Sequence, residues 1–201
     1  RCTVRLRLVD TNSHTHSRFC EQGTGFFVAP GLILTCAHVV SSKTCKHSHL
    51  IEVSWEKQTS QVQEITRFEE VDLALVRVDS FQGHPYVLLN DVYEPSDDLY
   101  SYGYPVTHSD GESATVEAEG WTQVGEKRQL KLKEGQIKPG ISGAPLLNRR
   151  TGTVCGVIAE TRDRTTDLGG RAIWTGTIWQ KIPVLKKQQA DQPWLTCMKA
   201  L

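Results

Sequence analysis

Short alternations of apolar and polar residues run along most of this chain. Val4, Leu6 and Leu8 are separated by arginines, which is the period of a half-buried β-strand. Glycine, proline, asparagine or aspartate punctuates the apolar runs every dozen or so residues, a pattern typical of an antiparallel sandwich or barrel. We expect strands at 4–9, 23–31, 32–40, 50–55, 61–68, 73–78, 99–104, 113–121, 129–133, 153–160 and 171–179.

Two segments depart from the strand pattern. Residues 10–22 are polar and are expected to form a loop. Only 179–190 has helical character, and Pro183 interrupts its first turn because proline has no backbone N–H to donate. The polar stretch 188–193 predicts the start of a linker to further protein.

The charge balance narrows the partners that the chain could have. Its 201 residues carry 23 basic and 23 acidic side chains, so the formal net charge is zero. We therefore expect no nucleic acid and no anionic membrane surface as a partner. No run of about 18 apolar residues is present, so no membrane span is expected. The chain opens at Arg1 without a signal peptide, and we expect an excised or processed domain.

The six cysteines are scattered and form no Cys-x-x-Cys pair. Their even number would permit disulfides, but a chain of this length can fold without them. We favour reduced thiols and a cytoplasmic location.

A serine between small residues is the first candidate for chemistry. Ser142 lies in Gly140-Ile141-Ser142-Gly143-Ala144-Pro145, where the glycines permit a close approach by another chain. Successive backbone N–H groups in such a turn can converge on one anionic oxygen. Acyl transfer needs this combination of nucleophile and donors. Such turns also occur in ordinary hairpins, so the motif alone decides nothing.

Two further residues complete a possible catalytic set. His38 follows an apolar strand and Asp72 precedes another, in the order histidine, aspartate, serine. A general base must receive the serine proton, and a carboxylate must hold the imidazole in the right tautomer. Taken singly, the histidine could be a structural residue and the aspartate a turn residue. Their coincidence in this order favours catalysis.

These segments resemble the chymotrypsin/trypsin-like serine protease family. The stretches 23–28 and 33–40 are similar to its histidine motif, 72–75 to its aspartate motif and 140–145 to its serine motif. The resemblance spans about 4–185 and is closer to bacterial, HtrA-like members than to digestive enzymes. It extends more weakly to trypsin-like modules of bacterial signalling and defence proteins. It implies an all-β fold of two six-stranded antiparallel barrels with a short C-terminal helix.

The resemblance also implies a role for each site residue. Ser142 would be the nucleophile, His38 the base and then the acid, and Asp72 the orienting carboxylate. The backbone N–H groups of Gly140 and Ser142 would form the oxyanion hole. The substrate would pair with a strand edge and enter a specificity pocket, and the residues implied for binding it are Gln136, Ala159, Glu160 and Thr161.

Several positions depart from the digestive members of that family. Ile141 replaces the aspartate that receives a new N-terminus, so activation by that ion pair is excluded and Ile141 is expected to be an apolar anchor in the core. Val39 replaces a half-cystine, and Ala144 replaces a glycine. Gln136 stands where trypsin has its basic-selecting aspartate. An acidic wall could come instead from Glu160, Asp163 and Asp167.

A metal site is a weaker possibility that we leave out of the prediction. Cys45, His47 and His49 alternate and would face one side of a strand, as zinc ligands could. His14 and His16 repeat this spacing. A polar surface hairpin explains the cluster as well, so we predict no metal and no cofactor.

The main prediction is a single domain over 1–201, with barrels at about 1–90 and 91–178 and a helix or linker start at 179–201. It would be a serine endopeptidase that acts on protein or peptide substrates through an acyl-enzyme, as a regulated module of a larger protein with regulatory domains or partners outside this chain. The first alternative is an inactive protease-like module that binds a peptide strand in the same cleft. The second is a β-rich structural module, which would leave the three motifs unexplained.

Overall fold

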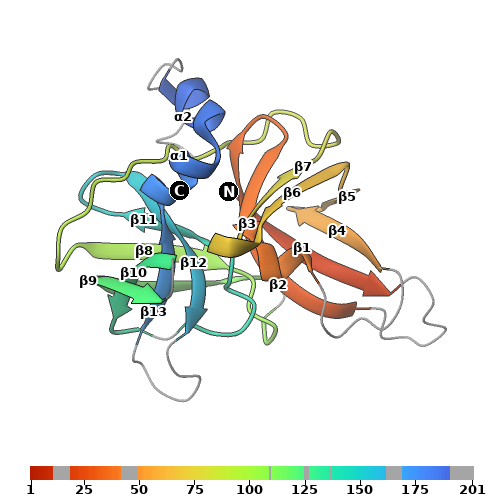
Figure 1. Ribbon diagram of the computed structural model, residues 1–201. Helices are drawn as coiled ribbons and strands as arrows, with labels where there is room; N and C mark the ends of the chain where they lie inside the picture. Colours follow the sequence, from red (N-terminus) through yellow and green to blue (C-terminus); the bar gives the residue numbers. More distant parts are fainter. Residues whose placement is uncertain are drawn as a thin grey trace.

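The computed structural model describes residues 1–10, 19–41, 49–108, 110–124, 127–135, 137–161 and 169–190. Within these ranges the chain is mostly β, in two lobes that Figure 1 shows side by side, with two short helices beside them. The expected all-β class is thus confirmed.

Seven antiparallel strands form the first lobe. Their order across the sheet is β5-β4-β1-β2-β3-β7-β6, so neighbours in the sheet are mostly neighbours in the chain. Their bounds are β1 Thr3–Asp10, β2 Phe19–Ala29, β3 Leu32–Cys36, β4 His49–Trp55, β5 Gln58–Gln61, β6 Glu64–Phe68 and β7 Leu73–Arg77.

This first sheet curls into a half-barrel, and the expected closed six-stranded barrel is wrong here. The two edge strands, β5 and β6, are consecutive in the chain and only Val62 and Gln63 separate them. The Val62 N–H donates to Ile51 O of β4 at 3.3 Å, and the Gln63 N–H donates to Arg77 O of β7 at 3.0 Å. The two edge strands are therefore connected by the covalent chain, whereas in a closed barrel they would be paired by backbone hydrogen bonds.

The second lobe is the closed six-stranded barrel that the resemblance implies, with the order β10-β13-β12-β11-β8-β9. Leu130, Leu132, Leu146 and Ile158 are fully buried in its core. The bounds are β8 Asp98–Gly103, β9 Glu112–Val124, β10 Lys127–Lys133, β11 Pro145–Asn148, β12 Thr153–Thr161 and β13 Gly170–Trp174.

The C-terminal helices differ from expectation in position. Helix α1 is Thr175–Lys181 and helix α2 is Pro183–Ala190, so the strand expected over 171–179 ends at Trp174. Pro183 begins α2 because the first helical position needs no N–H partner. No helix in the described part of the chain is long and apolar enough to cross a membrane.

Gln189 shows that part of the expected linker is packed against the fold. Its side chain is buried, its Nε2 donates to Val28 O and Val87 O at 2.9 and 3.0 Å, and its Oε1 accepts the Leu89 N–H at 2.9 Å. A buried amide with its partners satisfied fixes α2 against β2.

Two loop and strand expectations need correction. Strand β2 begins at Phe19, inside the loop expected over 10–22, because Phe19 pairs with Val9 across the ladder. The strand expected over 61–68 is split between β5 and β6.

The cysteines are only partly as expected. Cys2, Cys36 and Cys155 are free and buried, but Cys20 is disulfide-bonded, and the structure describes only this half of the bond. The expectation of reduced thiols is therefore wrong for Cys20, since sequence spacing does not reveal which distant cysteines meet. The cytoplasmic location stays a prediction.

Asp97 anchors the segment that leads into β8. Its carboxylate accepts bonds from Arg150 Nε at 2.6 Å and Nη2 at 2.9 Å, from Asn148 Nδ2 at 2.6 Å and from the Glu94 N–H at 2.7 Å. These contacts lower the pKa of Asp97 from 3.8 to about 2, and the hydrogen bonds from Arg150 are the largest cause. The charged form therefore stabilises the folded state.

This pKa predicts how stability depends on pH. Because the folded pKa lies below the unfolded value, the contribution is present above about pH 4 and is lost as pH falls towards about 2. We expect Asp97→Asn to lower the free energy of unfolding at pH 7 by about 2 kcal/mol, measured by urea denaturation. The loss should shrink as the pH approaches 2.

The neighbouring Asp98 provides a matched control. Its partner Arg149 lies at 3.0 Å, but both side chains are about half exposed, so Asp98→Asn should cost less than about 1 kcal/mol. Equal losses in the two variants would contradict the role given to Asp97.

Candidate active site

His38 follows β3 directly, in a 3₁₀ turn at Ala37–Val40. Its ring Nδ1 lies 2.8 Å from Asp72 Oδ2, and its backbone N–H donates to Asp72 Oδ1 at 3.0 Å. One carboxylate therefore holds both the ring and the backbone of this residue. The histidine side chain is 47% exposed and the aspartate side chain 21%, so the imidazole is accessible from solvent while its partner stays largely covered.

Asp72 occupies a left-handed backbone position, with φ of 59°, after a 3₁₀ turn at Glu69–Val71. Aspartate tolerates this conformation better than most residues. Its carbonyl accepts the Ala37 N–H at 3.0 Å, which joins the start of β7 to the turn that carries His38. The neighbouring Glu70 forms an ion pair with Lys181 at 2.5 Å. Asp72 is therefore the carboxylate that contacts the histidine.

The serine turn depends on both of its glycines. Gly140 and Gly143 have φ of 97° and 89°, which residues with a Cβ rarely adopt. A Cβ on Gly143 would lie 1.9 Å from the carbonyl oxygen of Thr24. Ile141 between them is 1% exposed and belongs to the core of the second barrel, as expected for an apolar anchor.

Thr24, fully buried on β2, ties this turn to the first lobe. Its N–H donates to Ser142 O at 2.9 Å and its hydroxyl donates to Gly140 O at 2.8 Å. The same hydroxyl oxygen accepts the Tyr104 N–H at 2.9 Å, and Thr35 Oγ1 on β3 donates to Thr24 O at 2.6 Å. Strand β3, which leads to the histidine, and the turn that carries the serine thus both bond to one residue, Thr24.

The backbone carbonyl of Ile158 on β12 makes a second joint between them. It accepts the Gly143 N–H at 2.7 Å and the Cys36 thiol at 3.2 Å. Burial raises the pKa of Cys36 well above its ordinary value, so the thiol stays protonated as a donor. Cys36 lies two residues before His38 and Gly143 one after Ser142, so a single oxygen relates base and nucleophile.

The serine itself is partly exposed between these joints. Among the described residues, the Ser142 hydroxyl and the His38 ring are not hydrogen-bonded to each other, and the ring bonds only Asp72. Such bonds are often long in a site without substrate and shorten in the substrate complex.

Two amide groups of the turn are available for an anionic oxygen. Within the described part of the chain, the N–H groups of Gly140 and Ser142 donate to no protein acceptor, whereas Ile141 donates to Lys138 O and Ala144 to Ile141 O. An oxyanion hole requires unpaired backbone donors of this kind, and that role for Gly140 and Ser142 stays a prediction.

The model of the trypsin-like peptidase domain family matches residues 23–157, which is more than half of the chain and includes His38, Asp72 and Ser142. The chain belongs to this family.

Solved structures agree with the trypsin-like assignment at the level of the fold. The Rv3671c protease from M. tuberculosis, in its active form, is 18% identical with a TM-score of 0.71, over 100% of this chain and 86% of that chain. The serine endoprotease from Yersinia pestis is 20% identical with a TM-score of 0.68, over 92% of this chain and 63% of that chain. No curated protein matches the chain in sequence.

The trypsin-like domain has an open strand edge beside its serine turn. The pairing of β12 with β11 ends at Val157, and β13 pairs with the other side of β12. Within the described residues no strand covers Ala159 and Glu160 on the side of β11, so an extended peptide could pair there. Thr161 continues the strand opposite Gly170. The substrate role of these three residues stays a prediction.

The resemblance implies three walls for a specificity pocket, namely the residues just before Gly140, the strand at 159–161 and the segment 170–172, and this role stays a prediction. A Cβ on Gly170 would lie 2.4 Å from both Ile137 Cδ1 and Glu160 O. The Glu160 carboxylate is paired with Arg171 at 2.7 Å, which balances one charge of the expected acidic wall. Gln136, Asp163 and Asp167 lie outside the described residues.

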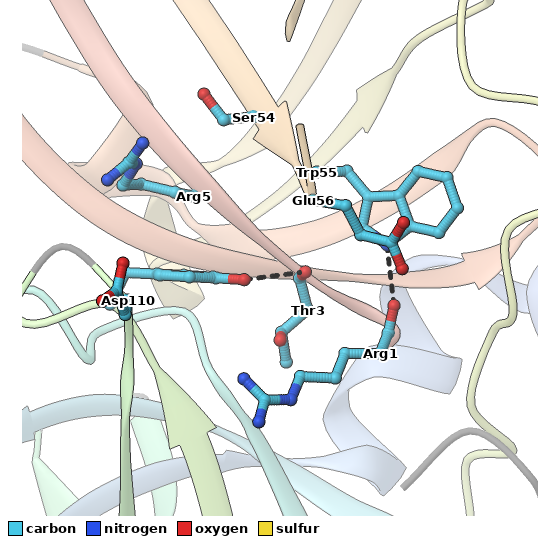
Figure 2. A pocket seen from close by; sticks show the side chains of 8 residues that line it. Arg1, Thr3, Arg5, Ser54, Trp55, Glu56 and Asp110 are labelled. Carbon is cyan, nitrogen blue, oxygen red and sulfur yellow. Dashed lines mark hydrogen bonds between the residues drawn. The ribbon is translucent and has the colours of Figure 1, made fainter. Parts of the chain in front are cut away.

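Figure 2 shows a separate cavity of about 420 Å³ in this trypsin-like domain. It lies between β1, the end of β4 and the segment after β8, where the Trp55 indole N–H donates to Arg1 O at 2.7 Å. None of the three candidate catalytic residues lines it. Tyr104 does, and its N–H also bonds Thr24.

One group of side chains among the described residues could hold a metal ion: Cys36, His38 and Asp72. The side chains of Cys45, His47 and His49, and those of His14 and His16, lie outside the described part, so the zinc possibility there is untested.

Sequence reasoning missed Thr24, Tyr104 and Cys36 as parts of the site. Thr24 stands in the histidine motif, but a hydroxyl that bonds a turn 116 residues away leaves no local signal.

The contacts of Thr24 give a prediction. Thr24→Val should leave Gly140 O and the Tyr104 N–H without their buried partner, which costs about 1–3 kcal/mol and loosens the serine turn. We expect kcat/KM on a peptide reporter to fall about ten- to a hundredfold. Thr24→Ser keeps the hydroxyl and should stay within a few-fold of wild type. Equal rates for the two variants would show that the hydroxyl does not position the turn.

Proposed function

We propose that this trypsin-like peptidase domain is a serine endopeptidase that cleaves protein or peptide substrates through an acyl-enzyme. Ser142 is the nucleophile, His38 the general base and then acid, and Asp72 the orienting carboxylate. The observation that carries the proposal is the His38–Asp72 pair at 2.8 Å, joined to the serine turn through Ile158 and Thr24. The family and the fold support protease function.

The contacts translate into a sequence of steps. Ser142 Oγ attacks the scissile carbonyl while His38 Nε2 takes its proton, and Asp72 stabilises the imidazolium that forms. The N–H groups of Gly140 and Ser142 donate to the tetrahedral oxygen, which carries the developing charge. His38 then gives its proton to the leaving amine, and water repeats the sequence on the acyl-enzyme.

The substrate is an extended peptide in this proposal. Its backbone pairs with the open edge of β12 at Ala159 and Glu160, which sets the scissile bond beside Ser142. This pairing uses main-chain groups, which every segment of a polypeptide offers. A peptide bond inside a longer chain can therefore be placed at the edge, as an endopeptidase requires.

Regulation by protein outside this chain belongs to the proposal. The serine turn packs on the segment after β8: a Cβ on Gly140 would lie 2.6 Å from Tyr104 O and 2.9 Å from Pro105 Cα, and the Val106 N–H donates to Pro139 O at 3.0 Å. A partner that moves this segment would change the shape of the oxyanion turn. Tyr104 also lines the cavity of Figure 2, where a partner could contact it.

An active-site-directed fluorophosphonate tests the proposed function. We expect the wild-type chain to take one label, because a serine activated by a base attacks phosphorus. Ser142→Ala should take none, and His38→Ala should label much more slowly. Ser96→Ala, at an exposed serine remote in sequence, should label like wild type. An unlabelled wild-type chain would favour the inactive, peptide-binding alternative.

The buried Ile141 gives a second prediction. Ile141→Asp would place a carboxylate without a partner in the core of the second barrel and displace the oxyanion turn. We expect turnover to fall about 10²–10³-fold, as when an oxyanion donor is lost. Ile141→Val keeps the apolar contact and should stay within about tenfold. Circular dichroism checks that both variants fold, and full activity in a folded Ile141→Asp would contradict the anchor.

A further inference from the structure

Three atoms of metal-ligand type surround one point beside the imidazole. Cys36, His38 and Asp72 each offer one ligand atom, and these atoms lie within 4.8 Å of one another. Cys36 ends β3, His38 lies in the turn that follows, and Asp72 reaches them from the start of β7. The proposed peptidase chemistry uses the histidine and the aspartate together but gives the thiol no part in proton transfer.

The Asp72 carboxylate and the Cys36 thiol make few hydrogen bonds to the protein. Among the described residues the Asp72 carboxylate accepts hydrogen bonds only from His38, and two of its roughly four acceptor positions stay open. Cys36 is a free thiol whose one bond, to Ile158 O at 3.2 Å, is a weak one. The His38 side chain is partly exposed and the Cys36 thiol is buried, so an ion would enter from the side of the histidine.

We propose that Cys36, His38 and Asp72 form an inhibitory site for a soft divalent metal ion, Zn²⁺ or Cd²⁺. Sulfur, nitrogen and carboxylate oxygen are the ligands that zinc takes in proteins, and water completes a tetrahedral set. Bond lengths of about 2.0–2.3 Å place such ligand atoms about 3.3–3.8 Å apart. The widest present separation, within 4.8 Å, would therefore contract by about 1–1.5 Å, and the His38 Nδ1–Asp72 Oδ2 separation of 2.8 Å would lengthen by about 0.5–1 Å. That the ion inhibits rests on the proposed function, whereas its binding does not.

The chemistry of binding accounts for inhibition. The thiol releases its proton to solvent, whereas the ring loses the proton on Nδ1 and takes one up from solvent on Nε2, so one proton is released in all. Bonds from the metal to Sγ, Nδ1 and the Asp72 carboxylate replace the hydrogen bonds to Ile158 O and between His38 and Asp72. A neutral imidazole that binds a metal through Nδ1 carries its proton on Nε2. That nitrogen then has no lone pair to take the proton of Ser142, and the base is blocked until the ion leaves.

Cadmium titration of Ser142→Ala tests binding without any activity. We expect the ultraviolet charge-transfer absorption of a cadmium–thiolate bond to rise to one Cd²⁺ per chain. It should be lost when Cys36→Ser is added, since a hydroxyl is a poor ligand for Cd²⁺ but can still donate to Ile158 O. Cys155→Ser changes the buried free thiol of the second barrel and should keep the signal. No signal in the parent protein, or a signal whose amplitude Cys36→Ser leaves unchanged, would overturn the site.

Zinc inhibition of the active chain tests the consequence. Zn²⁺ should inhibit peptide cleavage by the wild-type chain, and EDTA should restore the rate. Relative to its own uninhibited rate, Cys36→Ser should need more than about tenfold more Zn²⁺ for half-inhibition. Equal sensitivity of the two proteins would overturn the inhibitory role. A chain that cleaves no peptide would contradict the proposed function, and the cadmium titration would still decide whether the site exists.

Discussion

The carbonyl oxygen of Ile158 is the point on which the candidate site depends. It accepts the Cys36 thiol from one lobe and the Gly143 N–H from the other lobe's serine turn. A β-strand can place a histidine at its end, and a glycine turn can expose a serine. Neither element by itself fixes the position of the histidine relative to the serine. Hydrogen bonds to one shared oxygen limit how far His38 and Ser142 can move apart. Buried polar groups are costly to leave unpaired, so the packing of the lobes and the geometry of the site are secured together.

The serine turn is held without a charged anchor. Ile141 fills the core of the second barrel, while Thr24 bonds Gly140 O and Ser142 O from the first lobe. Neutral contacts of this kind can form without an ion pair to a newly formed N-terminus. They do depend on the segment at Tyr104, which lies against Gly140 and gives the proposed regulation a physical route.

The elements that carry local signals were predictable. Alternating apolar residues placed most strands, and the glycines around Ser142 marked the turn because left-handed φ values favour glycine. His38 and Asp72 were found because one directly follows an apolar run and the other directly precedes one. Contacts between distant segments left no such signal. The open edge between β5 and β6, the buried amide of Gln189 and the disulfide of Cys20 all depend on which remote parts of the chain meet. Strand β13 ends at Trp174, and the residues expected to continue it form α1.

Burst kinetics on an activated ester test the central claim most directly, since an acyl-enzyme accumulates when its formation outpaces its hydrolysis. The account predicts a rapid release of one equivalent of leaving group per active chain, followed by slower turnover, and no burst from Ser142→Ala. A Ser142→Ala chain that shows the same burst would place the nucleophile elsewhere and contradict the account.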